Sequence, residues 1–196
     1  MTFNNLGLPH SLLELLKKEN YTHPYPIQQE AIPIVLKGKD VLGIAQTGSG
    51  KTASYVLPIL STLNHKQRAK DRQVDVLVLV PTRELAEQVK DVFNLFEKGI
   101  SNTVKTMAIY GGVSINPQMK ALFGVSVLVA TPGRLLDLVN SNAVHFDKLQ
   151  TLILDEADKL LNLGFQDEMN QIFALLPKKR QNLLFSATLN EKVEEI

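Results

Sequence analysis

The chain has 196 residues, of which 44% are hydrophobic and 21% charged, and its formal net charge at pH 7 is +1. This size suits a single globular domain with a substantial core. A charge so close to zero argues against a uniformly basic surface, so any bound nucleic acid must be held by individually placed groups. The absence of cysteine excludes disulfides, thiolate metal sites and cysteine nucleophiles, and makes the cytoplasm the expected compartment. Neither a membrane-spanning apolar run nor a secretory signal is recognisable, so no membrane association is expected.

Short apolar runs alternate along the chain with segments whose apolar residues recur at helical spacing. Two helices are expected first, over residues 11–19 and 27–36, the second with a kink at Pro33. The candidate strands then cover residues 41–45, 76–80, 104–110, 125–130, 151–154 and 182–185. Between them, the candidate helices cover residues 53–63, 83–98, 116–122, 133–140 and 167–175. This alternation predicts an α/β fold, with a parallel sheet that carries helices on both faces.

A glycine-rich run lies where the first strand is expected to turn into a helix. It reads Ala45-Gln46-Thr47-Gly48-Ser49-Gly50-Lys51-Thr52. The backbone amides of such a turn, together with the positive end of the following helix, form an anion site that Gly48 and Gly50 leave sterically open. Lys51 adds a charge for the outer phosphates, and Thr52 adds a hydroxyl for magnesium. The pattern therefore predicts a phosphate-binding loop, although the strict form of the motif begins with glycine and this chain has Ala45.

A run of acidic residues, Asp155-Glu156-Ala157-Asp158, follows the buried strand expected at 151–154. Ligands bind outside the carboxyl ends of the strands in open parallel sheets, so Thr52 and Asp155 can converge there on one magnesium ion. Glu156 is then free to position or deprotonate an attacking water. Each motif alone also fits a plain loop or the acidic first turn of a helix. The glycine-rich run and the acidic run occur in this order, each directly after an expected strand. Together they favour a nucleoside triphosphate site with Lys51, Asp155 and Glu156 as its catalytic residues.

A longer series of motifs resembles one family. The chain is similar to the first RecA-like domain of a DEAD-box RNA helicase, a P-loop NTPase fold. The matching residues, in family order, are Phe3, Tyr21, Pro26-Ile27-Gln28, the run 45–52, PTRELA at 81–86, Gly111-Gly112, TPGR at 131–134, DEAD at 155–158 and SAT at 186–188. The resemblance covers nearly all of residues 1–196, which we expect to form one RecA-like domain with a nucleotide-recognising region over about 1–36. It implies ATP and ADP as ligands, with magnesium.

The resemblance also implies how adenine is recognised. The Gln28 carboxamide would bond the adenine edge, since it offers one donor and one acceptor, and Tyr21 would pack on the ring. Two positions depart from the family pattern. Asn20 replaces a usual glycine and tolerates positive φ, whereas Tyr25 replaces a usual threonine, a change that can remove a hydrogen bond to the glycine-rich run. The nucleotide-binding residues expected on this basis are Tyr21, Gln28, Gln46, Thr47, Gly48, Ser49, Gly50, Lys51 and Thr52.

Three turns at strand ends are expected to hold RNA. Exposed backbone amides, hydroxyls and guanidinium groups near helix starts bind phosphate well, so the expected grip is on the backbone of a single strand, with the 2′-hydroxyl distinguishing RNA. Ordinary helix capping and ion pairing would explain the same residues one by one. The expected RNA contacts are Pro81, Thr82, Arg83, Gly111, Gly112, Thr131, Pro132, Gly133 and Arg134.

The resemblance implies that the hydroxyls of Ser186 and Thr188 bond to Asp158 and couple the nucleotide site to RNA. A second RecA-like domain, which would complete the RNA groove and supply charge-stabilising arginines, is absent from these residues. We therefore expect a monomeric fragment that binds adenine nucleotide weakly and hydrolyses it negligibly. In the parent protein, ATP would close two domains around RNA and separate short duplexes, with hydrolysis driving release.

Two alternatives stay open. One is a P-loop ATPase that acts on DNA or protein, and the other is a non-catalytic RNA clamp that ATP locks. The polar run at 65–73 is expected to be a solvated connection rather than an RNA contact. The four histidines, His10, His23, His65 and His145, lack metal-ligand spacing and are expected to be surface residues.

Overall fold

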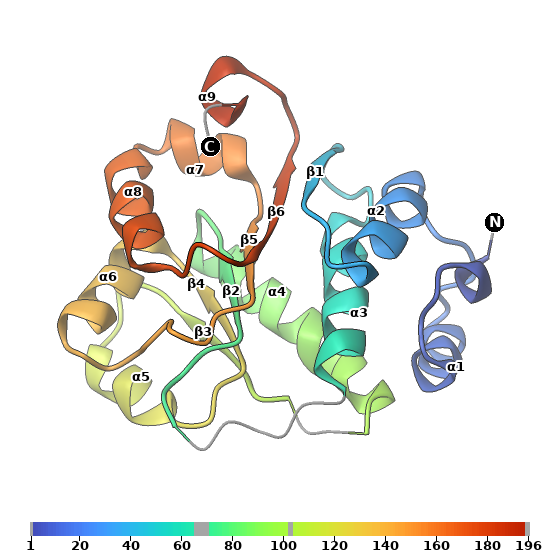
Figure 1. The fold of residues 1–196 in the computed structure, drawn as a ribbon, viewed down its shortest axis with the longest axis horizontal. Helices are drawn as coiled ribbons and strands as arrows, with labels where there is room; N and C mark the ends of the chain where they lie inside the picture. The colour runs from blue at the N-terminus through green and yellow to red at the C-terminus, as the bar shows by residue number, and fades with distance from the viewer. Residues whose placement is uncertain (1, 65–70, 102–103, 195–196) are drawn as a thin grey trace.

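The computed structural model describes residues 2–64, 71–101 and 104–194, and its helices and strands alternate along the chain (Figure 1). The strands are β1 (Val41–Ile44), β2 (Val76–Leu79), β3 (Thr106–Ile109), β4 (Val127–Ala130), β5 (Thr151–Leu154) and β6 (Gln181–Ser186). The helices are α1 (His10–Lys18), α2 (Pro26–Leu36), α3 (Lys51–Leu63), α4 (Arg83–Phe96), α5 (Ile115–Ala121), α6 (Pro132–Asn140), α7 (Ala157–Asn162), α8 (Gln166–Leu175) and α9 (Glu191–Glu194), with short 3-10 turns at Phe3–Asn5 and Glu97–Gly99.

The predicted α/β fold is confirmed, with differences at the ends of elements. β3 is shorter than the apolar run at 104–110, because it pairs with β4 over four positions, Thr106 to Ile109. α3 begins at Lys51, inside the glycine-rich run, rather than at Ala53. α7 was not predicted, since its six residues are too few to display helical periodicity. Pro33 lies inside α2 as expected.

The six strands found in the described residues run parallel, in the order β1-β6-β5-β2-β4-β3. Their last residues lie close together along the sheet: Leu79 of β2 pairs with both Leu154 of β5 and Ala130 of β4, and Ile44 of β1 pairs with Ser186 of β6, two residues beyond the partner of Leu154. The segment that follows each strand therefore leaves the sheet from the same edge.

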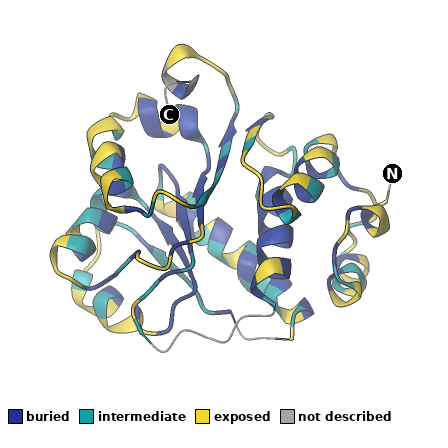
Figure 2. Cartoon of the chain, viewed as in Figure 1, coloured by how far each residue is buried: buried dark blue, intermediate teal, exposed yellow. Residues whose placement is uncertain are grey.

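Side chains on the two faces of the sheet belong to two separate cores. In β2, Val76 and Val78 pack with α1 to α4, whereas Leu77 and Leu79 pack on the side of α5 to α8. Figure 1 shows these two groups of helices on opposite sides of the sheet, and Figure 2 shows the buried strands between them. Because both faces are covered, β2, β4 and β5 are buried at every position, as parallel strands usually are.

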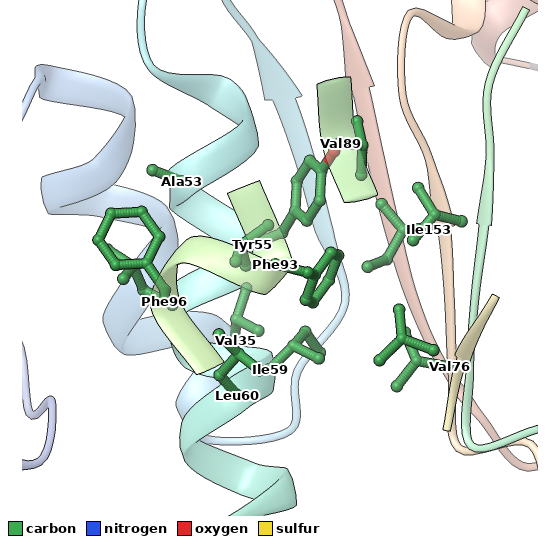
Figure 3. Packing of buried hydrophobic residues seen from close by; sticks show 14 of the residues in the cluster. Val35, Ala53, Tyr55, Ile59, Leu60, Val76, Val89, Phe93, Phe96 and Ile153 are labelled. Carbon is green, nitrogen blue, oxygen red and sulfur yellow. The ribbon is translucent and has the colours of Figure 1, made fainter. Parts of the chain in front are cut away.

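α3 is the most deeply buried helix of the first group. Of its residues, only Thr52 and Thr62 are not buried. The Tyr55 ring lies 5.3 Å from Phe185 and 6.5 Å from Phe93, measured between ring centroids, and Figure 3 shows Tyr55 and Phe93 side by side in this core. The helix that follows the glycine-rich run is thus fixed by packing against β6 and α4.

Within the described residues, every helix is too short or too polar to cross a lipid bilayer.

The core of α3 allows a matched test of packing. Leu60 is completely buried, whereas Leu175 at the end of α8 is 50% exposed. Leu60→Ala should lower the free energy of unfolding by about 2–5 kcal/mol, because it removes buried carbon and leaves a cavity. Leu175→Ala should change it by less than about 0.5 kcal/mol. Urea denaturation measures both, and equal losses would contradict this assignment of the core.

Candidate functional site

An open cleft of about 610 Å³ lies around the start of α3, at the sheet edge where the strands end. It gathers residues that are far apart in the sequence, from the segment before α2, the glycine-rich run, the first turns of α4 and the end of β5. The expected site residues that line it are Tyr21, Gln28, Thr47, Gly48, Gly50, Lys51, Thr52, Asp155 and Glu156. Gln46 and Ser49 belong to the same run but do not line the cleft.

The glycine-rich run forms a tight turn into α3. Gly48 and Gly50 have φ angles of +81° and +83°, a left-handed conformation that glycine adopts without steric cost. The Lys51 ammonium reaches back across the turn and donates to the Ala45 carbonyl oxygen at 2.8 Å. An anion at the start of α3 would meet free helix amides there and would compete with Ala45 for the Lys51 ammonium.

Gln28 connects α2 to this turn. It is 1% exposed, so it is not a solvated surface residue of the helix. Its Nε2 donates to the Gly50 carbonyl oxygen at 3.1 Å, and its Oε1 accepts from the Tyr25 backbone N–H at 2.9 Å. A carboxamide has two N–H donors and an oxygen with two lone pairs. One donor and one acceptor site therefore remain for a ligand.

Asp155 is 2% exposed, and both of its carboxylate oxygens are hydrogen-bonded. Oδ2 accepts from the Tyr55 hydroxyl at 2.7 Å, and Oδ1 accepts from the Glu156 backbone N–H at 2.9 Å. Burial raises the pKa of the Asp155 carboxyl above its ordinary value, against the opposing effects of the Tyr55 hydrogen bond and the Lys51 charge. The pKa of the Tyr55 hydroxyl is raised well above its usual value, first by burial and second by the negative charge of Asp155. The Thr52 side chain has a smaller, opposite effect on this pKa.

Glu156 has a left-handed backbone, with φ +54° and ψ +50°. This conformation costs a residue with a Cβ about 1–2 kcal/mol and is concentrated at functional sites. The Glu156 carboxylate forms an ion pair with Lys159 at 3.0 Å, and the Lys159 side chain is 53% exposed. The turn directs Glu156 into the cleft, directly after the buried Asp155.

The end of β6 contacts the acidic run. The Thr188 hydroxyl donates to Asp158 Oδ2 at 3.1 Å. The expected bond from Ser186 to Asp158 is not found, because the Ser186 hydroxyl donates instead to the Thr188 backbone oxygen at 2.7 Å. Ser186 is completely buried at the end of the strand, and its hydroxyl closes the local turn that presents Thr188.

The three turns after β2, β3 and β4 lie side by side, since these strands are neighbours in the sheet. The Arg83 side chain is 60% exposed and its guanidinium lies 5.9 Å from the centroid of the Tyr110 ring. Gly111 and Gly112 are exposed. Thr82 caps α4 by accepting from the Leu85 N–H at 3.2 Å. This bond agrees with the alternative explanation that Thr82 is an ordinary helix cap.

Arg134 differs from an exposed RNA-contacting arginine. Only 9% of its side chain is accessible, and its Nη2 donates to the Val113 carbonyl oxygen at 2.8 Å. It therefore holds the turn after β3 against the start of α6. Thr131, at the N-cap of α6, accepts no capping bond through its side chain, so its hydroxyl stays available. Pro132 is buried and Gly133 is half-buried.

Several sequence-based interpretations concern residues outside the cleft. His10 and His23 are exposed, His145 is half-buried, and His65 lies outside the described residues. In the part of the chain that the structure describes, no group of three or more histidine and acidic side chains could hold a metal ion. Of the polar run at 65–73, residues 65–70 also lie outside that part, and Asp71 pairs with Lys148 at 2.9 Å, at the edge opposite the cleft.

Comparison with known proteins agrees with this geometry. The model of the DEAD/DEAH box helicase family matches residues 25–196. The chain is 46% identical to the DEAD-box ATP-dependent RNA helicase CshA of Streptococcus pneumoniae, over 100% of this chain and 36% of that protein. It is 43% identical to the ATP-dependent RNA helicase DeaD of Haemophilus influenzae, over 100% of this chain and 31% of that protein. The chain belongs to the DEAD/DEAH box helicase family.

A solved structure supports the same assignment. The crystal structure of a DEAD box protein from Methanococcus jannaschii matches with a TM-score of 0.90 and 35% identity, over 100% of this chain and 52% of that one. The predicted RecA-like fold is thereby confirmed. The chain spans about a third of the length of the curated relatives named above.

Two of the departures from the family pattern have a structural explanation in this DEAD-box domain. Asn20 has φ +61°, which asparagine tolerates better than most residues. The Tyr25 ring packs on Gly50, since a Cβ built on Gly50 would lie 2.8 Å from Tyr25 Cδ2. The link to the glycine-rich run that a hydroxyl at position 25 could have supplied is made here by Gln28.

Some residues of the site were missed by sequence reasoning. Leu85, Gln88 and Val92 of α4 line the cleft, and their spacing of three to four residues places them on one helix face. Tyr55 was missed because a tyrosine within an apolar helix looks like any core residue. Lys159 was missed because an ion pair three residues apart on a helix is usually only a solvated contact.

The two glycines of the turn provide a matched test. Both have positive φ, but a Cβ on Gly48 would meet nothing within 4 Å, whereas one on Gly50 would lie 2.4 Å from Gln28 Nε2. Gly48→Ala should therefore cost about 1–2 kcal/mol of unfolding free energy from backbone strain alone. Gly50→Ala should cost at least about 1 kcal/mol more, because it also breaks the Gln28 bond. Equal losses in urea denaturation would contradict the proximity of Gln28 to Gly50.

Proposed function

We propose that this chain is the nucleotide-binding half of an ATP-dependent RNA helicase, with the cleft as its ATP site and the turns after β2, β3 and β4 as half of its RNA groove. One observation carries the proposal: Gln28, Lys51 and Asp155 come from distant segments and meet in a single cleft. The names of relatives such as CshA, an ATP-dependent RNA helicase, agree with it.

The nucleotide would lie along the cleft from Tyr21 to Glu156. The amides of the glycine-rich run would bind the phosphates, and Lys51 would exchange the Ala45 oxygen for phosphate oxygen. At the other end, the free donor and acceptor of Gln28 suit the edge of adenine, and Tyr21 offers an aromatic face. Tyr21 is itself held in place by edge-on contact with Phe96, at a centroid distance of 5.3 Å.

Thr52 and Asp155 fit magnesium. Both supply hard oxygen ligands, and proteins usually hold this ion through one or two side chains while the phosphates supply other ligands. Asp155 and Thr52 both line the cleft next to Lys51. When bound, magnesium would neutralise charge on the phosphates.

Glu156 would position the attacking water and accept its proton. Its left-handed turn brings a second carboxylate into the cleft directly after Asp155. Lys159, whose side chain is 53% exposed, pairs with it in this structure, and this pair would open when a nucleotide and water enter, since ion pairs with a solvated partner are weak. A chain that used ATP only as a lock for an RNA clamp would not need this carboxylate, which favours hydrolysis over that alternative.

The RNA strand would lie across the turns that follow β2, β3 and β4. Gly111, Gly112 and Gly133 present backbone amides, Thr131 presents a hydroxyl, and Arg83 presents an exposed guanidinium, all of which suit phosphate and sugar oxygen. Pro81 and Pro132 would shape these turns, and Arg134 would hold two of them together. Such groups read no bases, so the grip would be independent of sequence, and RNA would be preferred over DNA through its 2′-hydroxyls.

Nucleotide and RNA sites would communicate through the contact between Thr188 and Asp158, which joins the end of β6 to the acidic run. A second RecA-like domain of the parent chain would complete both sites and supply arginines that can be worth about a thousandfold or more in rate. Alone, the chain would be a monomer that binds nucleotide and hydrolyses it negligibly. The parent would separate short RNA duplexes, rather than act on another polymer as a different P-loop ATPase.

Calorimetric titration with ADP and GDP tests the adenine assignment. With magnesium present, wild type should prefer ADP by at least about tenfold, or about 1.4 kcal/mol. Gln28→Ala should reduce the ratio of the two affinities to near one, even if it weakens both by loosening the turn. Gln29→Ala is the control, since the Gln29 side chain donates to the Pro24 carbonyl oxygen instead. A ratio that Gln28→Ala leaves unchanged would sink the assignment.

Amide chemical shifts test the RNA assignment. Addition of a short oligouridine to ¹⁵N-labelled chain should shift the backbone amides of Gly111, Gly112 and Gly133, because these groups are proposed to contact phosphate. Gly38, a solvent-exposed glycine at the end of α2, should not move. The matching deoxyuridine oligomer should produce smaller shifts. Shifts confined to other parts of the chain would refute the proposed RNA path.

A further inference from the structure

Tyr55 reaches the nucleotide site from inside the protein core. It is completely buried and does not line the cleft. Its hydroxyl nevertheless donates to Asp155 Oδ2 at 2.7 Å. Thr52, the other residue proposed to hold magnesium, precedes Tyr55 by about one helical turn on α3. The phenol thus contacts one of the two residues that are proposed to hold magnesium, and its helix carries the other.

The position of this hydroxyl is determined by core packing. The Tyr55 ring lies between Phe93 of α4 and Phe185 of β6, at centroid distances of 6.5 and 5.3 Å. These contacts leave the ring no room to turn away, because protein interiors are close-packed. A phenylalanine would fill the same space without a buried polar atom that needs a partner. The hydroxyl is therefore best explained by what it bonds.

The Asp155 carboxylate is held from two directions. Oδ2 receives the Tyr55 hydroxyl, and Oδ1 receives the Glu156 backbone N–H at 2.9 Å. Two donors on different oxygens prevent the carboxylate plane from rotating, and each oxygen keeps a second lone pair. Without the phenol, one donor would remain, and the plane could rotate about it.

We propose that Tyr55 is a positioning residue for magnesium, whose hydroxyl fixes the direction in which Asp155 presents its oxygens to a magnesium nucleotide. This inference rests on the proposed ATP site and adds a buried residue that holds the Asp155 carboxylate from the side of the core. Hydrogen-bond partners of ligating carboxylates commonly change metal affinity by about 10–100-fold when they are removed. Because Tyr55 lies outside the cleft, its loss should spare the binding of nucleotide without metal.

The test compares the affinity for ADP in magnesium with that in EDTA, by calorimetry on the whole chain. Tyr55→Phe removes one oxygen and keeps the ring. The ratio of interest is the ADP affinity in magnesium divided by the ADP affinity in EDTA. Tyr55→Phe should lower this ratio by about tenfold and leave the affinity in EDTA at the wild-type value. Ser61→Ala is the matched control. It removes a buried hydroxyl from the same helix, where Ser61 donates only to the Leu57 carbonyl oxygen at 2.8 Å, and it should leave the ratio unchanged.

The outcomes separate this inference from the function on which it rests. A wild-type ratio of one would refute the proposed magnesium site, and the role of Tyr55 with it. A wild-type ratio above one that Tyr55→Phe leaves unchanged would overturn the inference alone. So would an equal loss of affinity in magnesium and EDTA, which would indicate a purely structural role.

A second variant restores the donor. Tyr55→p-aminophenylalanine places an N–H on the same ring, so it should recover most of the ratio that Tyr55→Phe loses. Thermal unfolding establishes whether each variant is folded. If Tyr55→Phe does not fold, the amino variant decides: a near-wild-type ratio supports the positioning role, and a ratio reduced tenfold in a folded chain contradicts it.

Discussion

The parallel direction of the strands is the constraint on which the rest of the structure depends. Because β1 to β6 run parallel and end within two residues of one another, the segments that carry polar chemistry leave the sheet from one edge. The order of the strands across the sheet then separates the nucleotide site from the proposed RNA site. β1, β6 and β5 end in the glycine-rich run, the Ser186–Thr188 turn and the acidic run, whereas β2, β4 and β3 end in the turns proposed for RNA. Within the first group, β5 lies next to β2, so the acidic run is the nucleotide-site segment nearest the turns proposed for RNA.

Many groups of the cleft are satisfied within the protein before any ligand binds. Lys51 donates to Ala45, and Glu156 pairs with Lys159. A nucleotide would gain only the difference between its own contacts and those it replaces, since hydrogen bonds are exchanged rather than created. The exchange is easiest at the half-exposed pair of Glu156 with Lys159. The bond between Tyr55 and Asp155 is buried, and Tyr55 does not line the cleft, so this bond can persist while others change.

Much of this arrangement could be predicted from the sequence, because hydrophobic period and turn residues are local properties. The strand at residues 151–154 and the turn at Gly48 and Gly50 needed no tertiary information. What could not be predicted depends on contacts between distant segments. Ser186 was expected to bond to Asp158, but the local turn uses its hydroxyl for the Thr188 carbonyl oxygen. Arg134 was expected to face RNA, but its guanidinium holds Val113. Tyr55 looked like a core residue, which its ring is, and only the fold shows that its hydroxyl meets Asp155.

The central claim is that Lys51, Thr52 and Asp155 form one phosphate and metal site at this edge of the sheet. A crystal structure of the chain with ADP and manganese, located by its anomalous scattering, tests this most directly. We predict a diphosphate on the amides of residues 48–52, the Lys51 ammonium on phosphate instead of Ala45, and the metal near Thr52 and Asp155. A diphosphate bound elsewhere, or a metal distant from Asp155 with Lys51 still on Ala45, would contradict the account.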